Sequence, residues 1–255
     1  MPFPAQTIPS PALFTGLFKR PLLKGKLIAR YKRFFADVEL DTGEIITAHC
    51  PNTGKMTGCA EPGFTAWVQP NDDPKRKLKY TLELVQNTQE EWIGVNTHRA
   101  NNIVKVALQQ GLIASLPNIS DIACEVKYGK EQSKIDFLLT HTDDSLTYLE
   151  VKSVTLQAPK SSLGYFPDTI STRAHKHCRE LMHVLDTPSN LPQRAVMLYL
   201  VQHTGISQVS PATHIDSTYA QLVAEAKSLG VEFLAYNCKI DQENILINQE
   251  LNFIM

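Results

Sequence analysis

The spacing of hydrophobic and polar positions changes near residue 96 and divides the chain into two parts. Before that point, apolar residues occur in short runs rich in β-branched and aromatic side chains, separated by turn signals such as Asp41-Thr42-Gly43 and Pro62-Gly63. After the first of these turns, strands are expected at 64–69, 80–86 and 92–95. Many short strands with close turns are typical of a small barrel, so residues 19–96 are predicted to form an OB-like domain.

Beyond residue 96, apolar positions recur at helical spacing in three stretches, at about 97–110, 171–185 and 217–229. Asn96 or Thr97 can cap the first of these helices, and Asp216 can cap the third. Extended apolar runs lie between the helices, and strands are expected at 122–127, 134–140, 146–154, 194–202 and 231–236. This alternation predicts an α/β domain with a mixed sheet over residues 97–255.

The stretch 134–154 has the pattern of a β-hairpin, with a five-residue polar break at 141–145 between two apolar runs. If Thr140 pairs with Leu146, Asp136 lies opposite Glu150, and Lys152 follows on the same face of the sheet. The other face is expected to be core and carries the apolar side chains of Ile135, Phe137, Leu139, Leu149 and Val151.

Two carboxylates that face each other across a hairpin repel unless a cation lies between them. Mg²⁺ (or Mn²⁺) is the expected cofactor, because Mg²⁺ takes one or two carboxylates and leaves the rest of its shell to water and phosphate oxygens. Lys152 could then hold or help deprotonate the water that attacks phosphorus. An aspartate followed by Glu-x-Lys is the arrangement of the PD-(D/E)-x-K nucleases, so Asp136, Glu150 and Lys152 are the predicted catalytic residues.

A third carboxylate joins the predicted metal ligands Asp136 and Glu150 in one of two or three possible registers. If Lys127 pairs with Lys134, Glu125 falls opposite Asp136. The tripeptide alone is weak evidence, because 125–127 and 225–227 are Glu-x-Lys as well. The alternative is a solvated cluster of cross-strand salt bridges. Repulsion between the carboxylates further predicts that Glu150→Gln leaves the metal-free protein as stable as before, or slightly more so.

Basic residues gather in the first part of the chain, where they indicate contact with a phosphate backbone. Residues 19–33 contain seven Lys or Arg, and a second basic cluster lies at 75–79, in a loop placed like those with which OB barrels hold oligonucleotides. The polar loop 50–59 and the helix expected from residue 171 add further cations, while His175 and His177 are expected to be surface residues. For each cation, an ordinary solvated position is the alternative. The predicted nucleic-acid-binding residues are Lys24, Lys26, Arg30, Tyr31, Lys32, Arg33, Lys55, Lys75, Arg76, Lys77, Arg173 and Lys176.

Composition adds a charge asymmetry and a cellular setting. The net charge of the 255 residues is −1, but residues 1–79 hold 12 Lys and Arg against 7 Asp and Glu, whereas the remainder holds 13 against 19. The five cysteines are scattered and never form Cys-x-x-Cys, which favours reduced thiols in a cytoplasmic protein without a zinc site. Residues 1–18 contain four prolines and no charge, and are expected to be a disordered or draped arm. No apolar run approaches the roughly 20 residues of a membrane span.

Five motifs resemble those of the bacterial and archaeal sugar fermentation stimulation protein A family, in the right order and over most of residues 22–236. They lie at 27–38, 50–59, 125–129, 150–155 and 164–168. The resemblance implies an OB-like N-terminal domain, a nuclease-like C-terminal domain, non-specific DNA binding and a proposed role in regulating sugar (maltose) utilisation. It assigns Asp136, Glu150 and Lys152 to the nuclease motif, although Ile135 stands where the name of that superfamily expects proline.

Together these observations predict a protein that binds DNA largely without regard to sequence and hydrolyses phosphodiester bonds with Mg²⁺. A non-catalytic DNA-binding regulator that keeps the fold is the competing class. An RNA-directed nuclease is a third possibility.

Overall fold

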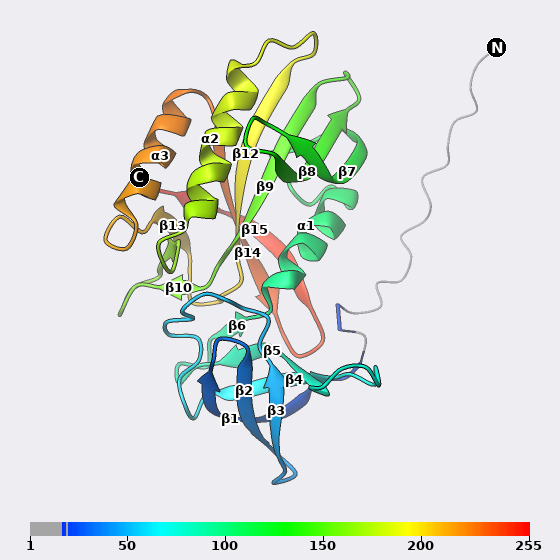
Figure 1. The fold of residues 1–255 in the computed structure, drawn as a ribbon, viewed down its shortest axis with the longest axis vertical. Coiled ribbons are helices and arrows are strands. Elements are labelled where there is room, and N and C mark those ends of the chain that lie inside the picture. Colours follow the sequence, from blue (N-terminus) through cyan, green and yellow to red (C-terminus); the bar gives the residue numbers. More distant parts are fainter. Residues whose placement is uncertain (1–16, 19) are drawn as a thin grey trace, which may run out of the picture.

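The computed structural model describes residues 17, 18 and 20–255, which form a β-barrel and a larger α/β domain packed against each other (Figure 1). Most of the predicted arm, residues 1–16, lies outside the described residues, as does Lys19. At the end of the arm, Phe18 is buried in an apolar cluster with Trp67 of the barrel and Ile245 of the α/β domain. The backbone N–H of Leu17 donates a hydrogen bond to Asn244 Oδ1 at 3.0 Å. The last residues of the predicted arm therefore contact both domains.

Six strands form the N-terminal sheet in the order β3-β2-β1-β4-β5-β6. They are β1 Leu23–Tyr31, β2 Phe35–Leu40, β3 Ile45–His49, β4 Thr65–Pro70, β5 Tyr80–Gln86 and β6 Trp92–Gly94. A parallel pairing between β3 and β5 closes the first five strands into a barrel. Alternate residues of each strand point inward and fill it with small and branched side chains such as Val38, Ala48, Val68 and Leu82. The predicted OB-like barrel is confirmed.

The C-terminal domain is built on a nine-stranded mixed sheet in the order β10-β11-β13-β15-β14-β12-β9-β8-β7. Its strands are β7 Ile119–Tyr128, β8 Ser133–His141, β9 Leu146–Val154, β10 Leu156–Gln157, β11 Leu163–Phe166, β12 Gln193–Val201, β13 Gln208–Pro211, β14 Glu232–Ile240 and β15 Ile245–Phe253. Strand β12 lies between β9 and β14, parallel to both, and seven successive residues from Ala195 to Val201 are fully buried. Continuous burial of this kind requires both faces of the sheet to be covered.

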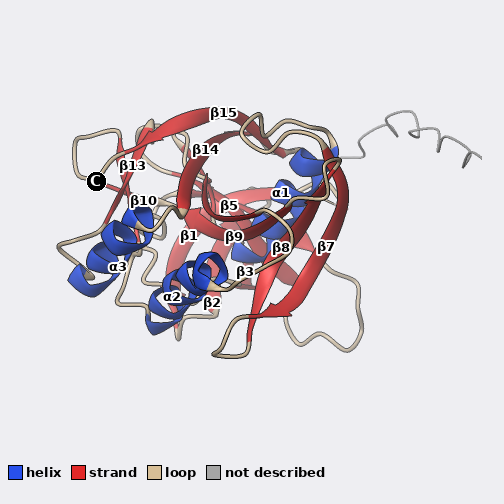
Figure 2. Ribbon diagram, turned by 90° about the horizontal axis from the view of Figure 1, so that it is seen from above, coloured by secondary structure: helices blue, strands red, loops and turns tan. Residues whose placement is uncertain are grey.

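Helices supply that cover. A 3₁₀ turn, Thr97–Arg99, leads into α1 Ala100–Gln109, whose apolar side packs on one face of the sheet. Helices α2 Thr172–Asp186 and α3 Ser217–Ser228 pack on the other face. Figure 2 shows the sheet curving around α1, with α2 and α3 outside the curve. No helix among residues 17, 18 and 20–255 is long and apolar enough to cross a membrane.

The central hairpin has the predicted register from Thr140 opposite Leu146 to Phe137 opposite Leu149. The ladder stops at Phe137, because the next backbone N–H, that of Val151, donates to the side chain of Asp136 instead of to β8. The prediction for Ile135 was wrong. Ile135 packs in the cluster under α2, whereas Phe137 packs in the cluster under α1.

The neighbouring strand changes sides at the matching position. Strand β7 pairs with β8 through Cys124–Phe137 and Val126–Ile135, and between them Glu125 has a left-handed φ of 55°. A left-handed residue inside a strand interrupts the regular alternation of faces. Side chains before and after Glu125 therefore enter different cores. The predicted pairing of Lys127 with Lys134 is confirmed.

Backbone hydrogen bonds join the barrel to the α/β domain. Gly94 N, in β6, donates to Gln202 O at 2.8 Å, and Ile93 forms a β-bridge with His203 beyond the end of β12. Next to this junction, the guanidinium of Arg99 pairs with the buried carboxylate of Glu83 from β5 at 2.7 Å. The connection between the domains is therefore fixed on both sides.

Four strands were missed by the sequence pattern: β10, β11, β13 and β15. Three of them are only two to four residues long, too short to show a period. β11 lies where a turn was expected at 164–168, and the chain turns only after Phe166. β15 contains the polar run Asn248-Gln249-Glu250, whose side chains are exposed, so its apolar alternation is interrupted in the middle.

Candidate active site

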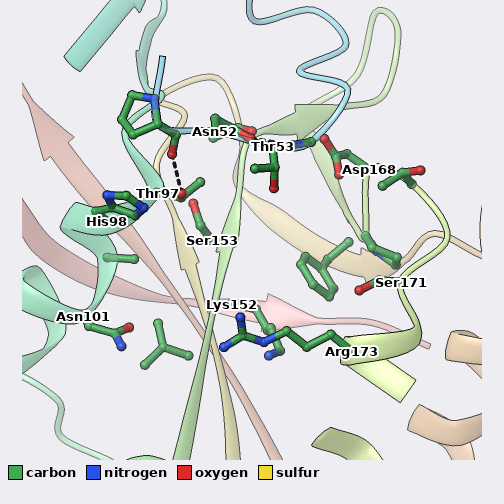
Figure 3. Close-up of a pocket in the computed structure, with 18 of the residues that line it drawn as sticks. Asn52, Thr53, Thr97, His98, Asn101, Lys152, Ser153, Asp168, Ser171 and Arg173 are labelled. Carbon is green, nitrogen blue, oxygen red and sulfur yellow. Dashed lines mark hydrogen bonds between the residues drawn. The ribbon is translucent and has the colours of Figure 1, made fainter. Parts of the chain in front are cut away.

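A cavity of about 780 Å³ lies between the barrel and the α/β domain. Its walls come from the barrel loop that contains Asn52 and Thr53, from Asn101 of α1, from Lys152 of β9 and from Arg173 at the start of α2. Figure 3 shows Arg173 extending from the helix toward the centre of this cavity. Asp136 and Glu150 also line it. The three predicted catalytic residues therefore lie in one cavity.

Asp136 is held by two donors from different elements. Asn101 Nδ2 donates to its Oδ1, and Val151 N donates to its Oδ2, both at 2.8 Å. Burial raises the pKa of this carboxyl group, and the nearby negative charge of Glu150 raises it further. The two hydrogen bonds fix the carboxylate at the point where β8 and β9 separate.

Glu150 is 1 % exposed, and its two carboxylate oxygens have different surroundings. Its Oε1 accepts a hydrogen bond from Lys152 Nζ at 2.7 Å and contacts His177 Nδ1. Its Oε2 is buried and has no hydrogen-bond partner among the described residues. Burial raises the pKa of Glu150, but Lys152 and His177 outweigh it and hold the pKa below its ordinary value. A buried charged oxygen without a donor is costly unless another group, such as a cation, completes its environment.

His177 completes this cluster and was not predicted. It is 5 % exposed, and its Nδ1 lies 2.8 Å from Lys152 Nζ. The expectation of a surface residue was wrong, although the signal was in the sequence: position 177 follows Ala174 by three and precedes Leu181 by four, on the buried stripe of α2. His175 is not a free surface residue either, because its Nε2 lies 2.8 Å from both carboxylate oxygens of Asp216.

Glu125, the predicted third ligand, is exposed and lines the edge of the same cavity. Its left-handed backbone separates it from the regular row of side chains. Among residues 17, 18 and 20–255, no group of three or more His, Cys, Asp or Glu is arranged to hold a metal ion. The structure thus brings two carboxylates together, and a ligand role for Glu125 stays a prediction.

The barrel loop above the site is fixed by Arg30, which was predicted to bind nucleic acid. Its Nη2 donates to the carbonyl oxygens of Asn52, Arg33 and Gly54 at 2.8 to 3.1 Å. These bonds commit the Nη2 of Arg30 to the protein. Arg30 therefore holds the loop in place, which gives it a positioning role that the sequence did not reveal.

Asp168 joins this loop to the α/β domain. Its Oδ2 accepts a hydrogen bond from Met56 N at 3.2 Å, and a Cβ atom at Gly54 would lie only 2.4 Å from the same oxygen. Thr97 adds a second connection, because its hydroxyl donates to Pro51 O at 2.7 Å (Figure 3). Two motifs far apart in sequence, 50–59 and 164–168, thus meet at the rim of the cavity.

Of the twelve residues predicted to bind nucleic acid, Arg173 is the one that lines this cavity. Lys176 contacts the backbone carbonyl of Glu131, and Tyr31 stacks on Phe35 with 5.5 Å between ring centroids. The remaining side chains, apart from Arg30, are exposed on the barrel or its loops: Lys24, Lys26, Lys32, Arg33, Lys55, Lys75, Arg76 and Lys77. Their role in binding stays a prediction.

Comparisons with known proteins identify the family. The family described as sugar fermentation stimulation protein RE domain matches residues 98–244, and the SfsA N-terminal OB domain matches residues 28–95. The sugar fermentation stimulation protein homolog of Pseudoalteromonas atlantica is 48 % identical over 238 residues, covering 93 % of this chain and 99 % of that protein. The homolog of Idiomarina loihiensis is 49 % identical over 232 residues, covering 91 % of this chain and 97 % of its own.

A solved structure extends the similarity to the whole fold. The structure described as Pyrococcus furiosus SfsA in complex with Ca²⁺ superposes with a TM-score of 0.81 at 23 % identity, covering 94 % of this chain and 99 % of that chain. Taken with the family matches and the relatives of nearly equal length, this places the chain in the sugar fermentation stimulation protein (SfsA) family.

Proposed function

We propose that this protein is a Mg²⁺- or Mn²⁺-dependent nuclease that hydrolyses phosphodiester bonds in DNA largely without regard to sequence. The observation that carries the proposal is the buried Oε2 of Glu150, which lacks a partner and lies in a cavity with Asp136 and Lys152. A cytoplasmic location is part of the proposal and is supported by the five cysteines, none of which forms a disulfide.

The residues fit a divalent cation of the hard type. Asp136 and Glu150 would hold it, and two carboxylates suit Mg²⁺, which retains several waters and binds phosphate oxygens. Each oxygen of Asp136 accepts one hydrogen bond and keeps a lone pair for a further interaction. The Ca²⁺ named for the Pyrococcus furiosus relative is likewise an oxygen-binding cation, which supports this choice.

When bound, the cation polarises a phosphoryl oxygen and lowers the pKa of a coordinated water. The chain's own contribution is Lys152, whose ammonium lies beside Glu150 and His177 at the floor of the cavity. From there it can orient the attacking water and stabilise negative charge that develops on phosphorus-bound oxygens. Arg173, at the cavity wall, is a second cation for that charge. In hydrolysis the water oxygen bonds to phosphorus and the water gives up a proton, while the P–O ester bond breaks and the departing oxygen takes up a proton.

The substrate proposal rests on charge. Exposed lysines and arginines on the barrel and its loops suit a polyanion, and backbone contacts carry no sequence information. DNA is favoured over RNA by the family resemblance. RNA belongs in the test as a competing substrate.

The test is cleavage of single-stranded DNA, double-stranded DNA and RNA with Mg²⁺, Mn²⁺ or EDTA. Lys152→Ala should abolish metal-dependent cleavage. Lys227→Ala is the matched control and should leave cleavage unchanged, because Lys227 ends another Glu-x-Lys tripeptide whose two charged residues are exposed on α3. Cleavage that persists in Lys152→Ala or in EDTA would contradict the proposal.

A second candidate is a non-catalytic DNA-binding regulator of sugar (maltose) metabolism. The name of the relatives favours it, as does the contact of Glu150 Oε1 with both Lys152 and His177, a pairing that can serve structure alone. Such a protein binds DNA and cleaves none of the substrates with any cation. The same assay, run beside a DNA-binding measurement, separates the two.

A further inference from the structure

We propose that the cavity takes single-stranded DNA and that Phe34 is the platform on which one of its bases stacks. The inference rests on the proposed function for the identity of the polymer, and it adds the strand state of the substrate and a residue that selects it.

The first support is the depth and size of the site. Asp136 and Lys152 are each 8 % exposed and Glu150 is 1 % exposed, so the proposed reaction centre lies at the floor of the cavity. Its volume of about 780 Å³ is within the range of about 300 to 1,000 Å³ typical of pockets for small ligands. A few nucleotides of one strand fit such a space. A duplex would first have to unpair and unstack there, which costs free energy.

The second support is Phe34 itself, which lines the cavity and is 45 % exposed. The other aromatic residues at this wall, Tyr165 and Phe166, pack against His214 and against Tyr199 and Tyr219. Phe34 stacks on no other ring among the described residues. An exposed phenylalanine at the wall of this cavity leaves the face of its ring in water and is suited to stacking with a base.

The third support is the rigidity of the turn that presents this ring. Lys32 and Arg33, just before Phe34, both have left-handed backbones with φ of 48° and 65°. Two consecutive residues in this region are strained unless their surroundings hold them. The holding contacts are present: Cys50 N donates to Phe34 O at 2.8 Å, and Arg30 Nη2 donates to Arg33 O at 3.1 Å. The ring is thus displayed by a fixed turn, so little order is lost when a base stacks on it.

The fourth support is a path for the backbone on the far side of the reaction centre. A second groove of about 560 Å³ adjoins the cavity, and Arg173 and Glu125 line both. Lys134, Lys176 and Arg179 also line that groove, and Arg179 pairs there with Glu131 at 2.9 Å, so the basic side chains outnumber the two glutamates. A strand whose base rests on Phe34 can therefore continue past Glu150 into a groove with excess positive charge.

The experiment measures equilibrium binding of the full chain in EDTA by fluorescence anisotropy, so that no cleavage intervenes. The ligands are a labelled oligothymidylate of about 15 nucleotides, within the known range of site sizes, and a blunt duplex of equal length. Wild type should bind the single strand at least about tenfold more tightly. Phe34→Ala should weaken single-strand binding roughly 5- to 100-fold, the equivalent of one lost base stack, and leave duplex binding unchanged. Phe34→Trp should retain the single-strand affinity.

Ile45→Ala is the matched control, because Ile45 is a 67 % exposed apolar side chain of β3 in the same barrel, is not among the predicted nucleic-acid-binding residues and does not line the cavity. It should change single-strand affinity less than Phe34→Ala does. Thermal melting must show that both variants fold. Equal affinity of wild type for the two ligands, or full single-strand affinity in folded Phe34→Ala, would overturn the inference. Absence of cleavage with Mg²⁺ beside Phe34-dependent binding would instead refute the nuclease and leave the stacking platform standing.

Discussion

Replacing Glu150 by glutamine removes one negative charge at nearly constant shape and separates two explanations of the buried cluster. Repulsion between Asp136 and Glu150 alone would make the variant at least as stable as wild type in the absence of metal. The structure reverses this expectation, because Glu150 Oε1 is the carboxylate partner of the buried ammonium of Lys152. Without it, that ammonium loses its counter-charge at 8 % exposure.

The size of the effect follows from the burial of the pair. Removing one partner of a buried ion pair costs about 3–5 kcal/mol, and removing both is close to neutral. Glu150→Gln should therefore lower the free energy of unfolding by about 3 kcal/mol or more in EDTA, and the melting temperature by roughly 10 °C for a chain of this size. Glu150→Gln combined with Lys152→Met should recover most of the loss.

The loss also depends on pH in a defined direction. The pKa of Glu150 is lowered in the folded protein. Its contribution to the free energy of unfolding is therefore fully present above the ordinary glutamate pKa and disappears as the pH falls through the pKa of the folded state. The difference between wild type and Glu150→Gln should accordingly shrink below about pH 4. Urea unfolding monitored by circular dichroism at several pH values measures this, with Glu225→Gln on the surface of α3 as control. A Glu150→Gln variant within 1 kcal/mol of wild type at pH 7, or a double variant no better than the single one, would refute the ion-pair explanation.

Three other predictions address the cation, a turn and the basic loop. Mg²⁺ or Mn²⁺ at about 100 times its dissociation constant should stabilise the fold by about 2.7 kcal/mol, a shift seen by calorimetry, and Asp136→Asn should abolish it; a shift that survives would place the cation elsewhere. Gly129→Ala should lower the free energy of urea unfolding by more than about 2 kcal/mol, because the φ of Gly129 is 70° and a Cβ there would overlap Glu180 Oε2 at 1.2 Å. Gly43 is the control: its φ is 86° and a Cβ would meet nothing within 4 Å, so Gly43→Ala should cost about 1 kcal/mol. Equal losses would mean that Glu180 moves freely. Replacing Lys75, Arg76 and Lys77 by alanine should flatten the dependence of log affinity for DNA on log salt by roughly 0.9 for each lost phosphate contact; an unchanged slope would remove this loop from the binding surface.

The register of the hairpin could be predicted because a short loop and period-two alternation leave few choices. Counting from Thr140 gave the correct partners as far as Phe137, and the capping side chain of Asp216 and the apolar stripe of α2 also gave correct helices. Counting failed where the backbone departs from regular geometry. Nothing in the residue type of Glu125 signals a left-handed φ, and nothing in that of Ile135 signals that it packs under α2 beside its partner Val126.

Side-chain roles that depend on tertiary contacts were equally out of reach. Arg30 is one basic residue among seven in its segment, and only the folded barrel shows that three carbonyl oxygens accept hydrogen bonds from its Nη2. The burial of His177 could have been inferred from its spacing on α2, but its polarity argued for the surface. A buried polar residue is recognisable only once its partners, here Glu150 and Lys152, are in place.

The backbone junction between β6 and the end of β12 has a mechanical consequence. Three contacts restrain the domains relative to each other: the hydrogen bond from Gly94 to Gln202, the bridge from Ile93 to His203, and the buried ion pair of Arg99 with Glu83. The two walls of the cavity therefore move as one rigid unit, because a hinge motion between the domains would break all of these bonds at once. Access for a large molecule must then depend on the loops at the rim. The width of the opening is constant and limits the size of the ligand that can enter.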